Sequence, residues 1–291
     1  MSQFADFVAG AVAVAMQPQQ HRYLLVDMSA TRGVNVAREL ALDGHCIDVL
    51  SGMPCDWNES ASPVLLELPR AQATAFQVQR MAAWLTRWQY GNCVSFIESQ
   101  LQMDILATEL KARSDALLSD DMPVVLRFFD GRVLLTLLTV LHPEQRTIFL
   151  AFALRWAAAD RRGKLVFLEP QQRATSTRFT APIEFDVAQQ ATMIDAGEAD
   201  AIIDVLLNQN NDGLMSMLPP QQHECISNAL AHAREFGITL LNEQVSFCSL
   251  SLELGERFYE ERPWAETMPQ VAAGSRRFAD VVAEMAEMEA K

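Results

Sequence analysis

Short apolar runs and longer amphipathic segments alternate along the first half of the chain. Short runs of β-branched and aromatic residues, bounded by Gly, Pro or Asp, are typical of strands covered on both faces. They predict strands at Tyr23–Asp27, Cys46–Leu50, Val64–Leu68, Cys93–Glu98, Val124–Phe129 and Lys164–Glu169. Helical spacing of apolar residues predicts helices between them, at Ala30–Leu42, Thr74–Trp88 and Leu101–Leu118. The alternation predicts an α/β fold with a small, partly parallel sheet and flanking helices, and an α+β fold is the alternative.

One stretch, residues 122–156, organises this half of the chain. Asp130 is suited to cap the helix that follows the strand, because its carboxylate can accept from the free N–H groups of a first helical turn. That helix, Arg132–Leu141, is apolar on nearly every side, so we expect it to be largely buried. Pro143 suits the first position of a second helix, Glu144–Trp156.

The helix predicted at Leu101–Leu118 has one apolar stripe and one charged face. Its apolar positions recur at helical spacing and include Ile105 and Leu110. Glu109, Lys111 and Arg113 are therefore expected to face solvent.

The second half of the chain has a helical pattern throughout. A polar stretch, residues 170–181, separates it from the first half and indicates two lobes: an α/β lobe at 1–170 and a helical lobe at 182–291. Helices are expected at Asp195–Leu207, Gln221–Phe236, Glu243–Glu260 and Arg276–Ala290. Gly237 is well placed to end the second of these.

Composition narrows the classes of protein that fit. Half of the 291 residues are hydrophobic and only 21% are charged, which is typical of a folded chain. The formal net charge of −14 repels phosphate backbones, so nucleic-acid binding is not expected.

The five cysteines form no CxxC pair and are interpreted as reduced thiols of a cytoplasmic protein. They are Cys46, Cys55, Cys93, Cys225 and Cys248. No metal site is predicted, because His223 and Cys225, the one close pair, lie two residues apart on a helix and point different ways. We expect no cofactor.

The N-terminal apolar segment, Phe4–Met16, is interpreted as a first helix. A signal peptide would need a basic segment before the apolar run, but no Lys or Arg precedes Arg22. The segment is also too short to cross a bilayer, so membrane insertion is not expected.

Candidate catalytic groups are few. His45 and Cys46 could suggest a thiol nucleophile with its base. Adjacent residues in a strand face opposite sides, however, so this pair is not expected to be catalytic. Asp27, Asp48 and Glu67 lie in or at the ends of predicted strands, where an α/β enzyme places acids. The alternative, which we favour, is that these acids cap helices or pair with arginines.

Arg127, Asp130 and Arg132 are the charges of greatest interest. A carboxylate flanked by two arginines could form a buried ionic network that fixes the strand against its helix. It could equally form an exposed recognition site for a partner. We favour the network.

Several aromatic and methionine side chains are candidates for contact with a partner, with core packing as the alternative for each. They are Trp88, Tyr90, Met215, Met217, Met285 and Met288, whereas Trp84 is interpreted as core. The acidic run at Glu253, Glu256, Glu260 and Glu261 is expected to be a solvated helix face, or else to receive a basic segment of a partner.

The residues Arg127-Phe128-Phe129-Asp130-Gly131-Arg132-Val133-Leu134 resemble the arginine-aromatic-aspartate-proline-arginine-valine signature of the effector-chaperone (adaptor) family of bacterial type VI secretion. That family was first defined as a domain of unknown function. The resemblance spans about Tyr23–Trp156, and Gly131 stands where the family usually has proline.

This resemblance implies a non-enzymatic adaptor chaperone in the cytoplasm. Such a protein binds a cognate secreted effector and hands it to the spike (valine-glycine repeat) protein of the secretion machine. The alternatives are a small hydrolase or transferase that uses acids such as Asp27 and Asp130, and an immunity protein that neutralises a toxin.

Overall fold

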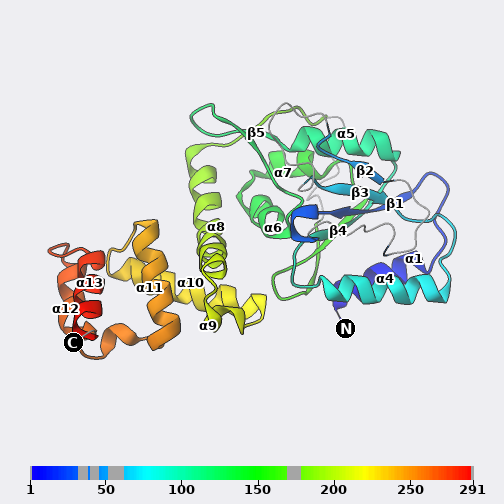
Figure 1. The fold of residues 1–291 in the computed structure, drawn as a ribbon. Helices are drawn as coiled ribbons and strands as arrows, with labels where there is room; N and C mark the ends of the chain where they lie inside the picture. The colour runs from blue at the N-terminus through cyan, green and yellow to red at the C-terminus, as the bar shows by residue number, and fades with distance from the viewer. Residues whose placement is uncertain (1, 32–38, 40–45, 52–61, 169–177, 290–291) are drawn as a thin grey trace. The chain divides into compact units, whose positions relative to one another are not determined.

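The computed structural model describes residues 2–31, 39, 46–51, 62–168 and 178–289. The chain divides into two units, Met1–Asp195 and Ala196–Lys291 (Figure 1), and each has its own hydrophobic core. Helix α8, Val187–Asn208, begins in the first unit and ends in the second.

A six-stranded sheet forms the centre of the first unit, with the strand order β2-β3-β1-β4-β7-β8. Every neighbouring pair in this sheet is antiparallel. The strands are β1 (His21–Val26), β2 (Cys46–Asp48), β3 (Val64–Glu67), β4 (Val94–Ser99), β7 (Arg155–Ala159) and β8 (Leu165–Phe167). Strand β1 lies between β3 and β4, with Tyr23 opposite both Glu67 and Ile97.

Both faces of this sheet are buried, which explains the continuous apolar runs. All six residues of β1 are buried, and successive side chains enter different cores. Tyr23 and Leu25 face the core formed with α5 (Met103–Arg113), α6 (Gly131–Val140) and α7 (Pro143–Leu150). Leu24 and Val26 face the other core, formed with α1 (Gln3–Val12) and α4 (Ala75–Arg87) (Figure 1).

A second, three-stranded sheet extends the first unit. Strand β5 (Asp115–Leu117) pairs antiparallel with β6 (Pro123–Val125) and parallel with β9 (Ile183–Glu184). Ile183 and Phe185 are each 6% exposed and belong to the first core. The segment after residue 182 therefore completes the first unit, and the division between units falls at Asp195, later than the expected 170–182.

The structure supports the α+β alternative and corrects the expected sheet. The predicted strands beginning at Tyr23, Cys46, Val64, Cys93 and Lys164 are confirmed as β1, β2, β3, β4 and β8. The main sheet is not partly parallel, and in the described chain the parallel pairing of β5 with β9 occurs in the small sheet alone. Alternation of strands and helices does not fix strand direction, because helical connections also join antiparallel strands.

Three predicted boundaries were wrong. The strand at 124–129 ends at Val125, and residues 126–130 form a loop. The second helix of the 122–156 stretch ends at Leu150 and gives way to β7, since pairing with β4 outweighs the helix propensity of its alanines. The helix expected at 101–118 ends at Arg113 and is followed by β5. Most of the predicted helix at 30–42 and residues 170–177 lie outside the described residues.

Arg113 is buried, contrary to the expected exposed face. Its side chain is 1% exposed and donates to the backbone carbonyls of Phe149 and Glu109, each at 2.8 Å, and to the Glu109 carboxylate at 2.7 Å. The guanidinium also lies 4.6 Å from the Phe152 ring centroid and 4.3 Å from that of Phe179. Burial lowers the pKa of Arg113, and Glu109 opposes this shift.

The second unit is helical. It contains the end of α8, α9 (Asp212–Met215), α10 (Pro219–Glu235), α11 (Leu241–Leu254), a 3-10 turn at Phe258–Glu260, α12 (Trp264–Ala272) and α13 (Phe278–Glu289). Gly237, with φ of 71°, follows α10 as predicted. Phe247 packs with Phe258 and Phe278 in one of its two cores. None of the helices in the described part of the chain is long and apolar enough to cross a membrane.

Candidate functional site

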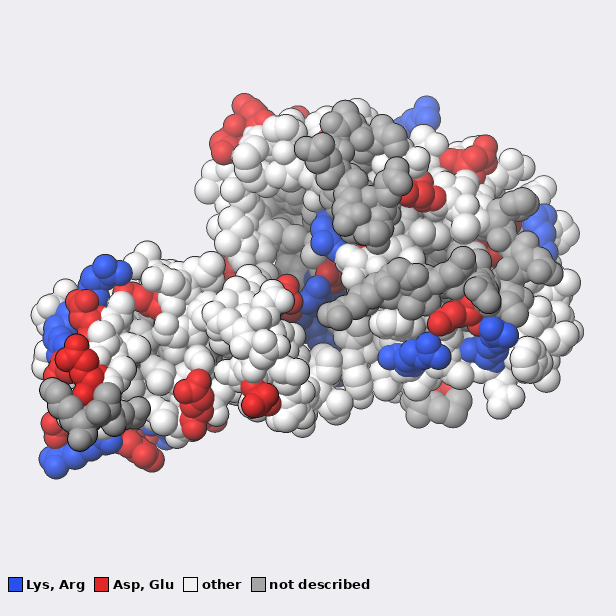
Figure 2. Space-filling view, in the orientation of Figure 1, with Lys and Arg blue, Asp and Glu red and all other residues white. Residues whose placement is uncertain are grey.

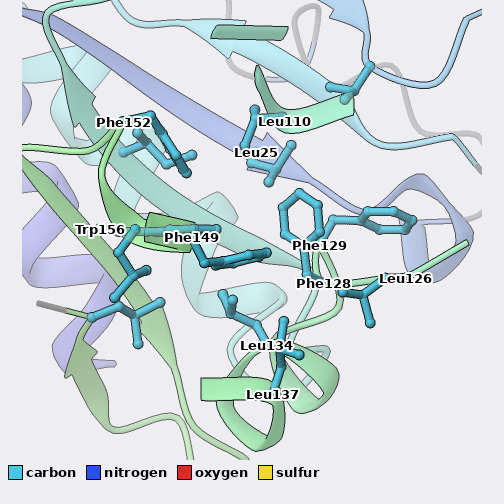
Figure 3. Close-up of a cluster of buried hydrophobic side chains, with 14 of the residues drawn as sticks. Leu25, Leu110, Leu126, Phe128, Phe129, Leu134, Leu137, Phe149, Phe152 and Trp156 are labelled. Atoms are coloured by element: carbon cyan, nitrogen blue, oxygen red, sulfur yellow. The ribbon is translucent and has the colours of Figure 1, made fainter. Parts of the chain in front are cut away.

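The aromatic residues of the signature lie in the first core. Phe128 and Phe129 are 1% and 2% exposed, on the loop between β6 and α6. Phe128 makes edge contacts with Phe149 and Trp156, at centroid distances of 5.5 and 6.0 Å (Figure 3). These contacts fix the loop to the sheet, while the side chains of Arg127 and Arg132 stay partly exposed and Asp130 is buried.

Arg127 joins this loop to the end of β1. Its Nη2 donates to Asp27 Oδ2 at 3.0 Å and to Ser29 Oγ at 2.6 Å. The Asp27 carboxylate is 3% exposed and also accepts from the backbone N–H and hydroxyl of Ser29. The guanidinium lies 5.5 Å from the Phe129 ring centroid, a cation–π distance.

Asp130 and Arg132 form a separate, local pair. Asp130 caps α6 as predicted, because its Oδ1 accepts from the Arg132 N–H at 2.9 Å. The Arg132 side chain chelates the same carboxylate through Nε, at 3.1 Å from both oxygens, and Nη2, at 2.7 Å. The structure therefore contains two acid–arginine pairs in place of one carboxylate between two arginines.

Asn92 and Cys93, just before β4, connect the two acid–arginine pairs through backbone hydrogen bonds. The Asn92 carbonyl accepts from Gly131 N–H at 2.6 Å, and the next carbonyl, of Cys93, accepts from Asp27 N–H at 2.7 Å. A Cβ added at Gly131 would lie 3.0 Å from the Asn92 carbonyl oxygen. The end of β1, the start of β4 and the signature loop thus converge. We call this group the motif site: Asp27, Ser29, Asn92, Arg127, Asp130 and Arg132.

Cys93 borders the motif site, but its thiol is expected to be unreactive. It is 1% exposed, and burial, followed by the negative charge of Asp27, raises the pKa of its thiol to about 12. A protonated thiol at neutral pH is neither a nucleophile nor a metal ligand. The described residues contain no cluster of three or more His, Cys, Asp or Glu that could hold a metal ion.

The other candidate acids have partners of their own. Asp48 accepts from Leu50 N–H at 3.0 Å and from the Ser62 hydroxyl. Glu67 lies 2.7 Å from His21 Nδ1, at the opposite end of β3 from the position that pairs with Asp48. His45 and Cys55 lie outside the described residues, and Cys46 is exposed.

The candidate contact residues of the first unit have different environments. Trp84 is 3% exposed and belongs to the core beneath α4. Trp88 and Tyr90 are half-buried at the end of α4 and in the loop that leads to Asn92. Trp88 packs against the same core as Trp84, with ring centroids 6.4 Å apart.

The candidate methionines lie in the second unit. Met285 is 6% exposed and belongs to the core with Phe247, so it is not accessible to a partner in this structure. Met215 and Met288 are more than half exposed, at 55% and 56%, and Met217 is half-buried.

The second unit carries the excess of negative charge. It contains sixteen Asp and Glu against six Lys and Arg, so it accounts for −10 of the net −14. Around α12 and α13, acidic side chains lie beside basic ones (Figure 2). All four residues of the acidic run are exposed. A polar cavity of about 480 Å³ lies beside this run, between residues 209–213 and the last turns of α11.

Sequence reasoning missed Asn92 and Ser29 as parts of the motif site. Their roles depend on contacts with residues distant in sequence, such as Gly131 and Arg127. The sequence Tyr90-Gly91-Asn92 is typical of a turn, but nothing in it indicates the partner.

Fold and site together define a two-unit α+β protein whose first unit bears a charged motif at one end of its central sheet. Residues 22–147 match the model of a family described as a domain of unknown function, DUF4123. The matched segment runs from β1 to α7 and includes the whole motif site. No curated protein and no solved structure matches the chain.

Proposed function

We propose that the protein is a cytoplasmic adaptor chaperone that binds a cognate type VI secretion effector and helps to load it onto the spike (valine-glycine repeat) protein. The observation that carries this proposal is the Arg127–Arg132 signature, which resembles that of the adaptor family and lies within the matched segment. In the structure the aromatic residues of this signature are buried and its charged residues form ion pairs, so the signature is part of the folded first unit.

The hydrogen bonds that Asp27 and Asp130 accept within the protein favour a binding function over catalysis. Asp27 and Asp130 each accept several internal hydrogen bonds, including one or more from an arginine. A general base must have a lone pair directed at its substrate. These two carboxylates instead hold the loop, β1 and α6 together.

The accessible surface offers features suited to a protein client. Phe76, Ile194 and Met215 are among the apolar side chains that are more than half exposed. The mechanism would be burial of an aggregation-prone or targeting segment of the client against such side chains. The acidic second unit would speed the encounter with a basic client more than it would raise affinity.

A tagged pulldown from the native host tests the proposal. Recovery of one effector together with a spike protein is the expected result. Recovery of a toxin domain alone would indicate an immunity protein instead. Absence of any stable protein partner, under conditions in which the cognate effector is expressed, would rule the adaptor function out and direct attention to substrate screens.

A further inference from the structure

Two of the unsatisfied polar atoms in the described core belong to the motif site. Six buried side-chain nitrogen or oxygen atoms have no hydrogen-bond partner, and they include Arg127 Nε and Asn92 Oδ1. Buried polar groups are nearly always paired, so each exception calls for an explanation. Here one atom is a donor and the other an acceptor.

Arg127 is held firmly but uses few of its donors. Nη2 is anchored by Asp27 and Ser29, and the guanidinium lies over Phe129. Neither Nε nor Nη1 bonds to any described residue, and the side chain is 41% exposed. A guanidinium fixed at one nitrogen, with the others unused, is pre-organised to donate to an added oxygen.

Asn92 supplies the complementary acceptor. The residue is 7% exposed with φ of 49°, and its Nδ2 donates to the Tyr90 carbonyl at 3.2 Å. Its Oδ1 accepts nothing. The Gly131 N–H donates to the Asn92 carbonyl, and the Asp27 N–H donates to the Cys93 carbonyl. These two bonds hold Asn92 close to the signature loop and to Asp27, the partner of Arg127.

The charge of the site favours a neutral ligand. Asp27 already balances Arg127, Asp130 balances Arg132, and the whole chain is acidic. Because each acid is balanced by an arginine, the site has no net positive charge to favour a carboxylate, whereas an amide offers one acceptor and one donor without charge.

We propose that the motif site binds a peptide group of an extended client segment, with Arg127 donating to its carbonyl and Asn92 Oδ1 accepting from its N–H. This inference rests on the proposed adaptor function and names the chemistry by which the client is recognised. The partly exposed end of the Arg127 guanidinium makes the first contact, because Nε and Asn92 Oδ1 are covered in the free protein. Binding therefore opens the Tyr90–Asn92 turn locally.

Nuclear magnetic resonance of the full-length protein tests the site without a client. The Arg127 Nε–H resonance is assigned with Arg127→Lys, and N-acetylglycine N-methylamide serves as the neutral peptide-group probe. We expect this resonance and the Asn92 backbone amide to shift saturably with the probe, and Asn92→Gly to abolish the shift. Equal shifts with sodium acetate, or no shift with either compound, would overturn the proposal.

Capture of the effector tests the same site in the complete complex. Arg127→Lys keeps the charge and Asn92→Gly keeps the positive φ, so both are expected to fold. Each should reduce captured effector about tenfold or more. The matched controls are Arg155→Lys, at another arginine that is about half exposed and paired with an acid, and Asn210→Gly, at another Asn with positive φ.

The two possible failures are distinguishable. If the wild type captures an effector and both motif variants capture it equally well, the inference is wrong and the adaptor function stands. If the wild type captures no effector, the adaptor function falls, and the probe titration still decides whether the motif site binds peptide groups.

Discussion

Arg113 Nε donates a hydrogen bond of 2.8 Å to the Phe149 carbonyl, and this bond ties α5 to α7 inside the first core. The same guanidinium holds the Phe179 ring, which precedes β9. One buried cation thus connects two helices and the segment that completes the small sheet.

Replacing Arg113 with Met should destabilise the first unit by about 3 kcal/mol. The substitution leaves the Phe149 and Glu109 carbonyls without their donor and removes the cation from three aromatic rings. Urea titration followed by tryptophan fluorescence measures the loss. Arg87→Met, at a side chain that is 61% exposed, is the control and should stay within about 0.5 kcal/mol of the wild type. Equal losses for the two variants would contradict this account.

Gly131 should tolerate neither Ala nor the proline of the related signature. Ala places a Cβ 3.0 Å from the Asn92 carbonyl oxygen, and Pro also removes the N–H that bonds to it. We expect thermal unfolding to show a loss of about 1 kcal/mol for Ala and more for Pro. Gly10→Ala is the matched control, because nothing lies near its Cβ position in α1, and it should stabilise by about 0.5–1 kcal/mol. A stabilised Gly131→Pro variant would refute the close approach.

The Cys93 thiol should make stability fall in alkaline solution. Its pKa is raised to about 12 in the folded protein, above that of an unfolded cysteine near 8.5. Between these values the unfolded chain releases the proton first, so the contribution is intact below pH 8.5 and is lost as pH rises towards 12. The difference in unfolding free energy between the wild type and Cys93→Ala should change by about 2 kcal/mol from pH 8.5 to 10. A difference that does not vary with pH would show that the thiol ionises freely.

The first unit should require residues beyond the matched segment. A chain of residues 1–195 is expected to unfold cooperatively, whereas 1–178 should lose about 3–6 kcal/mol through exposure of the sites of Ile183 and Phe185. The shorter chain also lacks Gln189, which donates to the Val140 carbonyl at 3.1 Å. Circular dichroism during heating compares the two chains. Identical melting temperatures would mean that β9 adds nothing.

Strands buried on both faces were predictable, because β1 and β3 each contain an uninterrupted apolar run and β4 combines Val94, Phe96 and Ile97 in one short segment. Strand β7 was not predictable in this way. Its Trp156 and three alanines suit a helix as well as a strand, and pairing with β4 and β8 decides between them. Strand direction also depends on the complete path of the chain.

The candidate site was predictable only in part. The Asp130 cap could be inferred, because it acts on the next turn of the chain. The partner of Arg127 could not, since Asp27 lies one hundred residues away along the chain. Arg113 was assigned to solvent because charge normally indicates exposure, and the carbonyls of Ile148 and Phe149 that accept from it lie at the end of another helix.

The position of β1 at the middle of the sheet constrains how the protein is made on the ribosome. β1 is translated before both of its neighbours, β3 at residues 64–67 and β4 at 94–99, and before β9 at 183–184. The nascent chain therefore carries an unpaired apolar strand until β3 and β4 have been translated. The first unit closes only after β9 has been translated, so its growing chain is exposed to aggregation until that point.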